Sequence, residues 1–408
     1  MQSFMYSLLT PTPFRYNKRM RFPFLQKDNL LPIVYIANLL FSFHFFLILY
    51  INSSFLNLYA TEGIIGLLYA LGSIGSLLLL LTAPKLLSKI GNQAFTLSYL
   101  ILEFIAVIGL TFSSSLALIA FFFVLHGAVV GLVSFGLDIF VEKHSTKETE
   151  TGGIRGLYLT LANTALVIAP TVVAFLLPRG DFGGVYLASA LFLIPTFILI
   201  RKYLKESKET FRPVSFSKEI EVFRKDRNLR NIFVVNLVLQ MFYAWMVIYT
   251  PIYLSLYIGF TWDKLGILFT FMLLPFLLFE LPLGKIADTF FGEKEILVAG
   301  LAITAAATSL ISYLTVPSFI LWAIILFLTR TGASAVEIMT ESYFFKHVNA
   351  ANFDTISVFR MARPISFIIT PLIAGIALGA LPYRFTFLVL VGILLLAIRP
   401  ALEIKDTR

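Results

Sequence analysis

Residues 30–51 read LLPIVYIANLLFSFHFFLILYI, a run that contains no Asp, Glu, Lys or Arg. A helix that rises 1.5 Å per residue needs about 20 residues to cross roughly 30 Å of hydrocarbon. Lipid offers no hydrogen-bond partner to a backbone, and this run is continuously apolar where a barrel strand would alternate. We therefore predict a transmembrane helix here.

Similar runs recur along the whole chain. Hydrophobic residues make up 58% of the sequence and charged residues only 13%, which is far too apolar for a soluble protein of 408 residues. The predicted spans are 30–51, 62–84, 92–112, 116–140, 154–177, 183–203, 231–257, 263–286, 294–314, 317–343, 352–378 and 383–400. We predict an all-α membrane protein with twelve transmembrane helices.

The basic residues indicate how the chain is oriented. With the N-terminus in the cytoplasm, 26 of the 32 Lys and Arg fall on the cytoplasmic side of these spans. Retained loops carry positive charge, so we expect both termini in the cytoplasm and a multi-pass location in the cell membrane, of the bacterial inner-membrane kind. The net charge of +9 is then a topology signal that can also contact anionic lipid headgroups, and it does not indicate nucleic acid.

The residues and motifs that the sequence lacks argue against several classes of function. The chain has no cysteine, and its four histidines show no H-x-x-x-H spacing, so we expect neither a metal site nor a cofactor. No GxxxxGK[ST] phosphate-binding motif occurs, which argues against direct ATP hydrolysis.

The chain divides into two similar parts at its longest polar stretch, Lys202–Arg230. A shift of about 200 residues aligns polar and small residues that apolar periodicity alone would not align: Asn38 with Asn236, Gly66 with Gly266, Asp138 and Glu142 with Glu337 and Glu341, and Pro170 with Pro371. Parallel repeats of this kind place a solute site between them. The predicted divisions are an N-terminal tail 1–29, a six-helix bundle 30–203, a basic cytoplasmic linker 204–230, a second bundle 231–400 and a tail 401–408.

Residues 284–294 read GKIADTFFGEK. Together with twelve spans in a six-plus-six repeat, this segment resembles the signature of the major facilitator superfamily, through Gly284, Asp288, Gly292 and Lys294. It departs by one extra residue before Gly292 and by Thr289 where a basic residue is usual. The N-half copy, PKLLSKIGNQ, has Pro84 and Ser88 where Gly and Asp would stand.

The resemblance implies a latch on the cytoplasmic face. In the superfamily, the Asp of this loop faces the eleventh helix, where this chain carries Arg360 and Arg363. The latch would close in one alternating-access state and open in the other; a fixed structural clamp is the alternative. The predicted latch residues are Gly284, Asp288, Gly292, Glu280, Glu337, Arg360 and Arg363.

The resemblance also implies that spans 1, 4, 7 and 10 line a central cavity. The candidate cavity residues are Asn38, His44, His126, Asn236, Gln240, Tyr243, Trp245 and Arg330. Arg330 lies near the middle of its span, about 20 Å from either end at 1.5 Å per residue. Its guanidinium cannot lose its proton, so it must face a carboxylate, water or an anionic solute. The alternative pairs Arg330 with Glu337 or Glu280.

Glu103 is a carboxyl in the middle of a predicted span. It should be protonated or turn inward toward His126 or His44. We expect Glu103 and His126 to be candidates for proton coupling; the alternatives are that Glu103 only ties two helices together and that His44 is a hydrogen-bonded core group.

The sequence favours a secondary active transporter that moves a small solute by alternating access, and not an enzyme. The expected partners are the solute, membrane lipids and a coupling ion such as a proton. Two alternatives stay open: a polytopic membrane enzyme that acts on lipid, and a membrane sensor or scaffold that has a transporter fold without transport.

Overall fold

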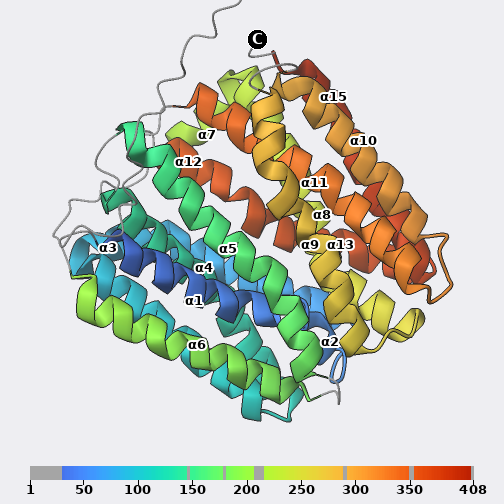
Figure 1. The fold of residues 1–408 in the computed structure, drawn as a ribbon, viewed down its shortest axis with the longest axis horizontal. Helices are drawn as coiled ribbons and strands as arrows, with labels where there is room; N and C mark the ends of the chain where they lie inside the picture. The colour runs from blue at the N-terminus through green and yellow to red at the C-terminus, as the bar shows by residue number, and fades with distance from the viewer. Residues whose placement is uncertain are drawn as a thin grey trace, which may run out of the picture.

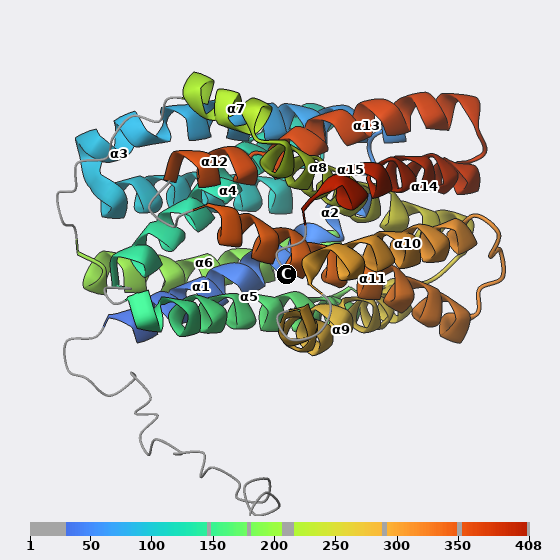
Figure 2. The ribbon, with the colours of Figure 1, turned by 90° about the horizontal axis from the view of Figure 1, so that it is seen from above.

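The computed structural model describes residues 30–144, 148–177, 181–205, 216–287, 292–348 and 353–405, and all regular structure in these ranges is helical. Eleven of its helices are long and apolar enough to cross a membrane. Most helices run along one common direction, and the first half of the chain lies beside the second (Figures 1 and 2). The predicted all-α membrane architecture is confirmed.

The helices of the two halves follow the predicted spans closely. Those of the first half are α1 (Leu31–Leu49), α2 (Asn52–Leu56), α3 (Glu62–Phe112), α4 (Leu116–His144), α5 (Glu148–Leu176) and α6 (Phe182–Tyr203). Those of the second half are α8 (Arg227–Ile252), a π-helical turn η2 (Tyr253–Tyr257), α9 (Trp262–Ile286), α10 (Glu293–Ile311), α11 (Phe319–His347), α12 (Phe353–Arg360), α13 (Ala362–Ala380), a 3-10 turn η4 (Tyr383–Phe385), α14 (Thr386–Leu396) and α15 (Ile398–Glu403).

Helix α3 contains two of the predicted spans, because the chain stays helical up to Gly91 and reverses its direction there. Four contacts with α4 show this reversal. In the two pairs before Gly91 the residue numbers increase together along both helices, whereas in the two pairs after Gly91 they increase in opposite directions. These pairs are Gly72 with Gly127, Ser76 with Gly131, Glu103 with His126, and Asn92 with Gly136. The eleven helices therefore accommodate the twelve predicted spans.

Gly91 and Gly292 adopt the same unusual backbone conformation 201 positions apart. Gly91 has φ 76° and ψ 169°, and Gly292 has φ 79° and ψ 175°. Only glycine enters this region of backbone space without strain. The loop after the second helix of each half thus needs its glycine for a turn, which supports the duplication.

Replacement of either glycine by alanine is expected to destabilise the protein. Strain in this region costs about 1–3 kcal/mol per residue, so Gly91→Ala and Gly292→Ala should each lower the melting temperature in detergent. Gly375→Ala is the matched control, because a Cβ at this helical position meets nothing within 4 Å. An unchanged melting temperature in both loop variants would contradict the argument.

Two spans that the sequence predicts as continuous helices are each interrupted in the structure. Span 352–378 breaks at Met361 between α12 and α13, and span 383–400 breaks at Ala397 between α14 and α15. Each break comes three residues before a proline, Pro364 or Pro400. A proline has no N–H for the carbonyl four residues earlier, and its ring crowds that carbonyl.

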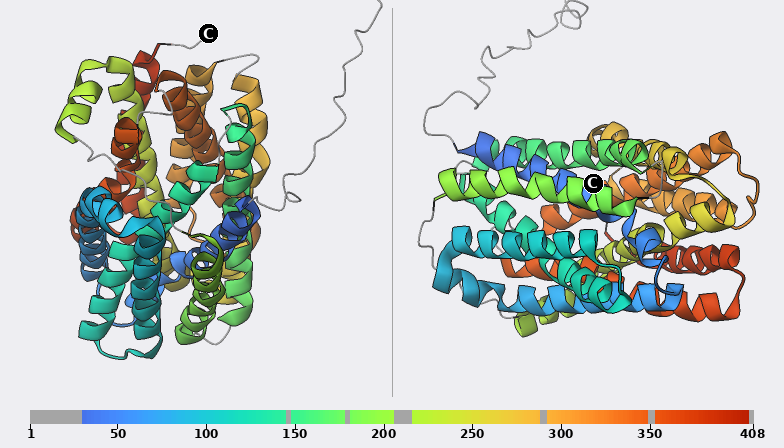
Figure 3. Two further views of the ribbon diagram at one scale, coloured as in Figure 1. Left: turned by 90° about the vertical axis from the view of Figure 1, so that its left-hand side faces the viewer. Right: turned by 90° about the horizontal axis from the view of Figure 1, so that it is seen from below.

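The two halves meet through reciprocal contacts between repeat-equivalent residues. Helix α3 packs against α13, and α5 packs against α9. A Cβ at Gly66 would lie 3.0 Å from Cβ of Pro371, and a Cβ at Gly266 would overlap the carbonyl oxygen of Pro170. These contacts lie near the ends of the helices that are remote from α7 (Phe216–Lys225), which we call the far side; the opposite end is the linker side. Figure 3 shows the two groups of helices from two further directions.

The predicted linker 204–230 contains the helix α7. Phe223 of α7 is buried, with its ring centroid 5.5 Å from Phe233 and 6.4 Å from Phe344. Both partners belong to the second half, so α7 docks on that half through one aromatic side chain.

Candidate functional site

A cluster of one carboxylate and two imidazoles lies inside the first half, between α1, α3 and α4. Oε1 of Glu103 lies 2.9 Å from Nε2 of His44 and 2.6 Å from Nδ1 of His126. His44 and Glu103 are fully buried, and His126 is only 4% exposed. The sequence predicts that Glu103 turns toward one of the two histidines, and the structure places it between both.

A fourth residue, Ser189 of α6, completes this cluster. Its Oγ lies 2.7 Å from Nδ1 of His44 and 2.8 Å from the His44 carbonyl oxygen. Sequence reasoning missed Ser189, because a single serine in an apolar helix has no spacing that marks it. We call Glu103, His44, His126 and Ser189 the proton cluster, after the proton-coupling role that the sequence predicts for Glu103 and His126.

The proton cluster accommodates two protonation states with the same positions of its heavy atoms. When Ser189 donates to the His44 carbonyl, Nδ1 of His44 donates to Ser189, and Nε2 either donates to a Glu103 carboxylate or accepts from a protonated Glu103. When Ser189 donates to Nδ1 instead, His44 is neutral and donates only from Nε2. The imidazolium and the neutral arrangement beside a Glu103 carboxylate differ by one proton.

A second cluster lies between the halves, around Arg330 of α11. Arg330 is 1% exposed, and its guanidinium lies over the rings of Phe242 and Tyr243 at 4.9 and 5.3 Å. Its Nη2 lies 3.5 Å from the hydroxyl of Tyr50, the C-cap residue of α1 in the other half. Glu337 accepts a hydrogen bond from Tyr243 at 2.6 Å, and no ion pair joins it to Arg330 among the described residues. The side chain of Glu280, the other predicted partner of Arg330, lies outside the described residues.

Arg363 of α13 extends this second cluster. Its guanidinium lies 5.5 Å from the centre of the Phe45 ring of the first half, and its side chain is exposed although it lies between the halves. The charge of Arg363 acts on both Tyr50 and Glu337. We call Arg330, Arg363, Tyr50, Tyr243 and Glu337 the arginine site.

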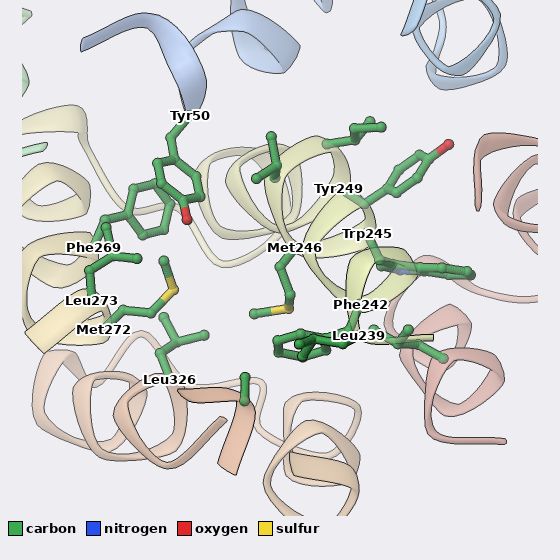
Figure 4. Packing of buried hydrophobic residues seen from close by; sticks show 14 of the residues in the cluster. Tyr50, Leu239, Phe242, Trp245, Met246, Tyr249, Phe269, Met272, Leu273 and Leu326 are labelled. Atoms are coloured by element: carbon green, nitrogen blue, oxygen red, sulfur yellow. The ribbon is translucent and has the colours of Figure 1, made fainter. Parts of the chain in front are cut away.

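The other predicted cavity residues have different surroundings. Asn38 is buried and donates to the carbonyl of Tyr158 at 3.0 Å, so it ties α1 to α5. Asn236 is buried and Gln240 is half-buried on α8. Trp245 is fully buried, its ring centroid lies 5.6 Å from that of Tyr249 at a tilted angle, and it points away from Tyr50 (Figure 4). In the described structure Trp245 packs among buried hydrophobic residues.

Most of the predicted latch cannot be assembled from the described residues. Asp288 lies outside them, and so does the side chain of Glu280. Arg360 instead pairs with Glu341 of the same half, through two contacts of 2.5 and 2.9 Å. Asp138 of α4 acts electrostatically on Arg360 from the other half. Gly284 does not bring two helices into close contact, since a Cβ there would meet Ile338 at an ordinary distance of 3.9 Å.

The small cavity beside the arginine site lies toward the far side. It is lined by residues of α1, α5 and α9, among them Tyr50, Pro170 and Phe269, and its volume is about 10 Å³. A volume of this size holds at most about one water molecule. The halves are therefore packed together on the far side of Tyr50, while Arg363 and Arg360 are exposed.

The two reciprocal halves agree with comparisons with known proteins. A family model described as the Major Facilitator Superfamily matches residues 34–265 and 248–403. The chain belongs to the major facilitator superfamily. A search of curated protein sequences gives no match.

Solved structures of other superfamily members have the same fold at low sequence identity. The nucleoside transporter NupG (D323A mutant) matches with a TM-score of 0.74 and 11% identity, over 91% of this chain and 99% of that one. The xylose transporter XylE from E. coli, in a partially occluded inward-open conformation, matches with 0.71 and 13%, over 93% and 98%. A POT family transporter in complex with a thioalcohol-conjugated peptide matches with 0.72 and 13%, over 90% and 94%. At these identities the likeness concerns the fold.

Proposed function

We propose that the chain is a secondary active transporter that moves a small solute by alternating access and couples it to a proton. The observation that carries the proposal is the proton cluster, in which a buried carboxylate lies within hydrogen-bond distance of two buried imidazoles. Ionisable groups are costly within a membrane span, and their chains are typical of proton pathways in transporters. Family membership and fold support transport over the enzyme and scaffold alternatives.

Helix α1 supplies a physical connection between the proton cluster and the space between the halves. His44 belongs to the proton cluster, Phe45 lies against Arg363, and Tyr50 contacts Arg330. Tyr50 follows His44 by six positions, a rise of about 9 Å along a helix. A change of charge at His44 that shifts α1 would therefore be felt at the arginine site.

The far-side packing supports a state that is closed on that side. On that side the repeat-equivalent glycines Gly66 and Gly266 lie in tight contact with the opposite half. Rocking of the halves would separate both contacts together. We also propose that the protein resides in the cell membrane with both termini in the cytoplasm, since 26 of the 32 Lys and Arg fall on one side of the predicted spans.

Proteoliposomes that contain a pH-sensitive dye test the proposal. Purified protein is reconstituted, and candidate solutes are added outside at zero membrane potential. We expect solute entry to be accompanied by acidification or alkalinisation of the lumen that stops when a protonophore is added. Solute entry without any proton movement would remove proton coupling, and product formation without net flux would remove transport.

A further inference from the structure

The arginine site holds more positive than negative charge. Neither Arg330 nor Arg363 forms an ion pair with a carboxylate among the residues that the structure describes. Glu337 is the acid within the site, and its Oε2 already accepts the hydrogen bond from Tyr243. Glu341 lies close by but is paired with Arg360. Two guanidinium groups therefore face one carboxylate.

The hydrogen-bonding capacity of Arg330 is also largely unused. A guanidinium carries five N–H donors. Nε of Arg330 is buried without a partner, and the contact of Nη2 with Tyr50 is long at 3.5 Å. Burial of an unpaired charge and of unmade hydrogen bonds is costly, so such a group is expected to acquire a partner when the protein works.

The surroundings of both guanidinium groups are aromatic. The rings of Phe242 and Tyr243 cover Arg330, and the ring of Phe45 covers Arg363. The hydroxyl of Tyr50 points from α1 toward the side chains of Met246 and Met272 (Figure 4). A solute bound between the arginines would thus meet oxyanion-binding donors at one end and apolar, polarisable side chains at the other.

We propose that the transported solute is a small organic anion with an apolar or aromatic body. Its carboxylate or phosphate oxygens accept hydrogen bonds from Arg330 and Arg363, and its negative charge balances the excess positive charge of the site. Because Tyr50 and Phe45 come from the first half and both arginines from the second, the anion bridges the halves. This inference rests on the proposed transport function and assigns its substrate class.

Thermal melting of the full-length protein in detergent tests the assignment. The panel consists of aromatic and aliphatic monocarboxylates and phosphate monoesters, each beside its neutral amide or parent alcohol. A ligand that binds the folded state raises the melting temperature by mass action. We expect shifts with anions and none with their neutral partners, and the carboxylate and phosphate arms identify which oxyanion is preferred.

Variants then locate the binding. Arg330→Gln and Arg363→Gln should each weaken the binding of the best anion at least tenfold, Tyr50→Phe should weaken it less, and Arg330→Lys should restore part of it. Arg399→Gln is the control, because Arg399 is 88% exposed and pairs only with Glu403 in the described chain. The assignment would be overturned if only neutral compounds raised the melting temperature, or if no anion of the panel did. It would also be overturned if anions stabilised both Gln variants as much as the unchanged protein. A neutral solute that still drives proton flux would leave the proposed function standing.

Discussion

Glu103→Gln is expected to abolish proton-driven accumulation of the solute while solute exchange across the membrane continues. Glutamine keeps an oxygen at the Oε1 position, where the nitrogens of His44 and His126 lie at 2.9 and 2.6 Å, so the helices stay tied. It cannot ionise, so the cluster loses the carboxylate that stabilises an imidazolium at His44. A gradient of one pH unit supports about tenfold accumulation per coupled proton, since 1.4 kcal/mol is a factor of ten. The variant should accumulate nothing above equilibrium.

The measurement compares uptake driven by a pH gradient with counterflow of the same solute in proteoliposomes. Glu221→Gln is the matched control, because Glu221 is 59% exposed on α7 and pairs only with Lys225 among the described residues. Full pH-driven accumulation by the Glu103 variant would show that the cluster is structural. Loss of counterflow as well, with a lowered melting temperature, would indicate that it only holds helices together.

Gly266→Val should arrest transport by preventing the halves from closing on the far side. A Cβ at this position would overlap the carbonyl oxygen of Pro170 and crowd Ala174, and these are backbone and short side-chain atoms that cannot turn aside. We expect at least a tenfold loss of transport. The protein should still fold, because the clash is confined to the contact between α5 and α9.

Two further glycine variants calibrate this effect. Gly66→Ala should have an intermediate effect, since its Cβ would lie 3.0 Å from Pro371 and from the Tyr249 hydroxyl; Gly63→Ala should have none, since its Cβ meets nothing within 4 Å. The chain has no cysteine, so Thr171→Cys provides a unique label at the contact that Thr171 makes with Thr270. Gly266→Val should increase labelling from the far side. Normal transport, or lost transport with unchanged labelling, would contradict the closure argument.

The sequence predicted the helices well because a span needs a long apolar run, which is a local property. It missed the breaks at Met361 and Ala397, although the prolines that follow them were visible, because hydropathy ignores the missing N–H. It also placed Gly284 and Gly292 in a latch, whereas Gly292 is needed for its positive φ and Gly284 makes no tight contact.

The polar clusters could be predicted only in part. A buried carboxyl and two histidines are rare enough in spans that their meeting was expected from composition and depth. Ser189 and Tyr50 carry no such signal, because serine and tyrosine are common in apolar helices and their roles depend on which helices pack together. The partners of Arg330 and Arg360 likewise depend on the tertiary arrangement, in which Glu337 bonds to Tyr243 and Glu341 to Arg360.

The central claim is that the two halves rock about the site between them, and pairs of spin labels measure this most directly. Cysteines at Ser88 and Glu295 report on the linker side, and cysteines at Ser114 and Tyr313 report on the far side; all four side chains are exposed. In lipid, we predict two distance populations for each pair, with the far-side distance long when the linker-side distance is short, and a shift toward far-side opening in Gly266→Val. A single distance for each pair, unchanged by pH and by that variant, would contradict the account.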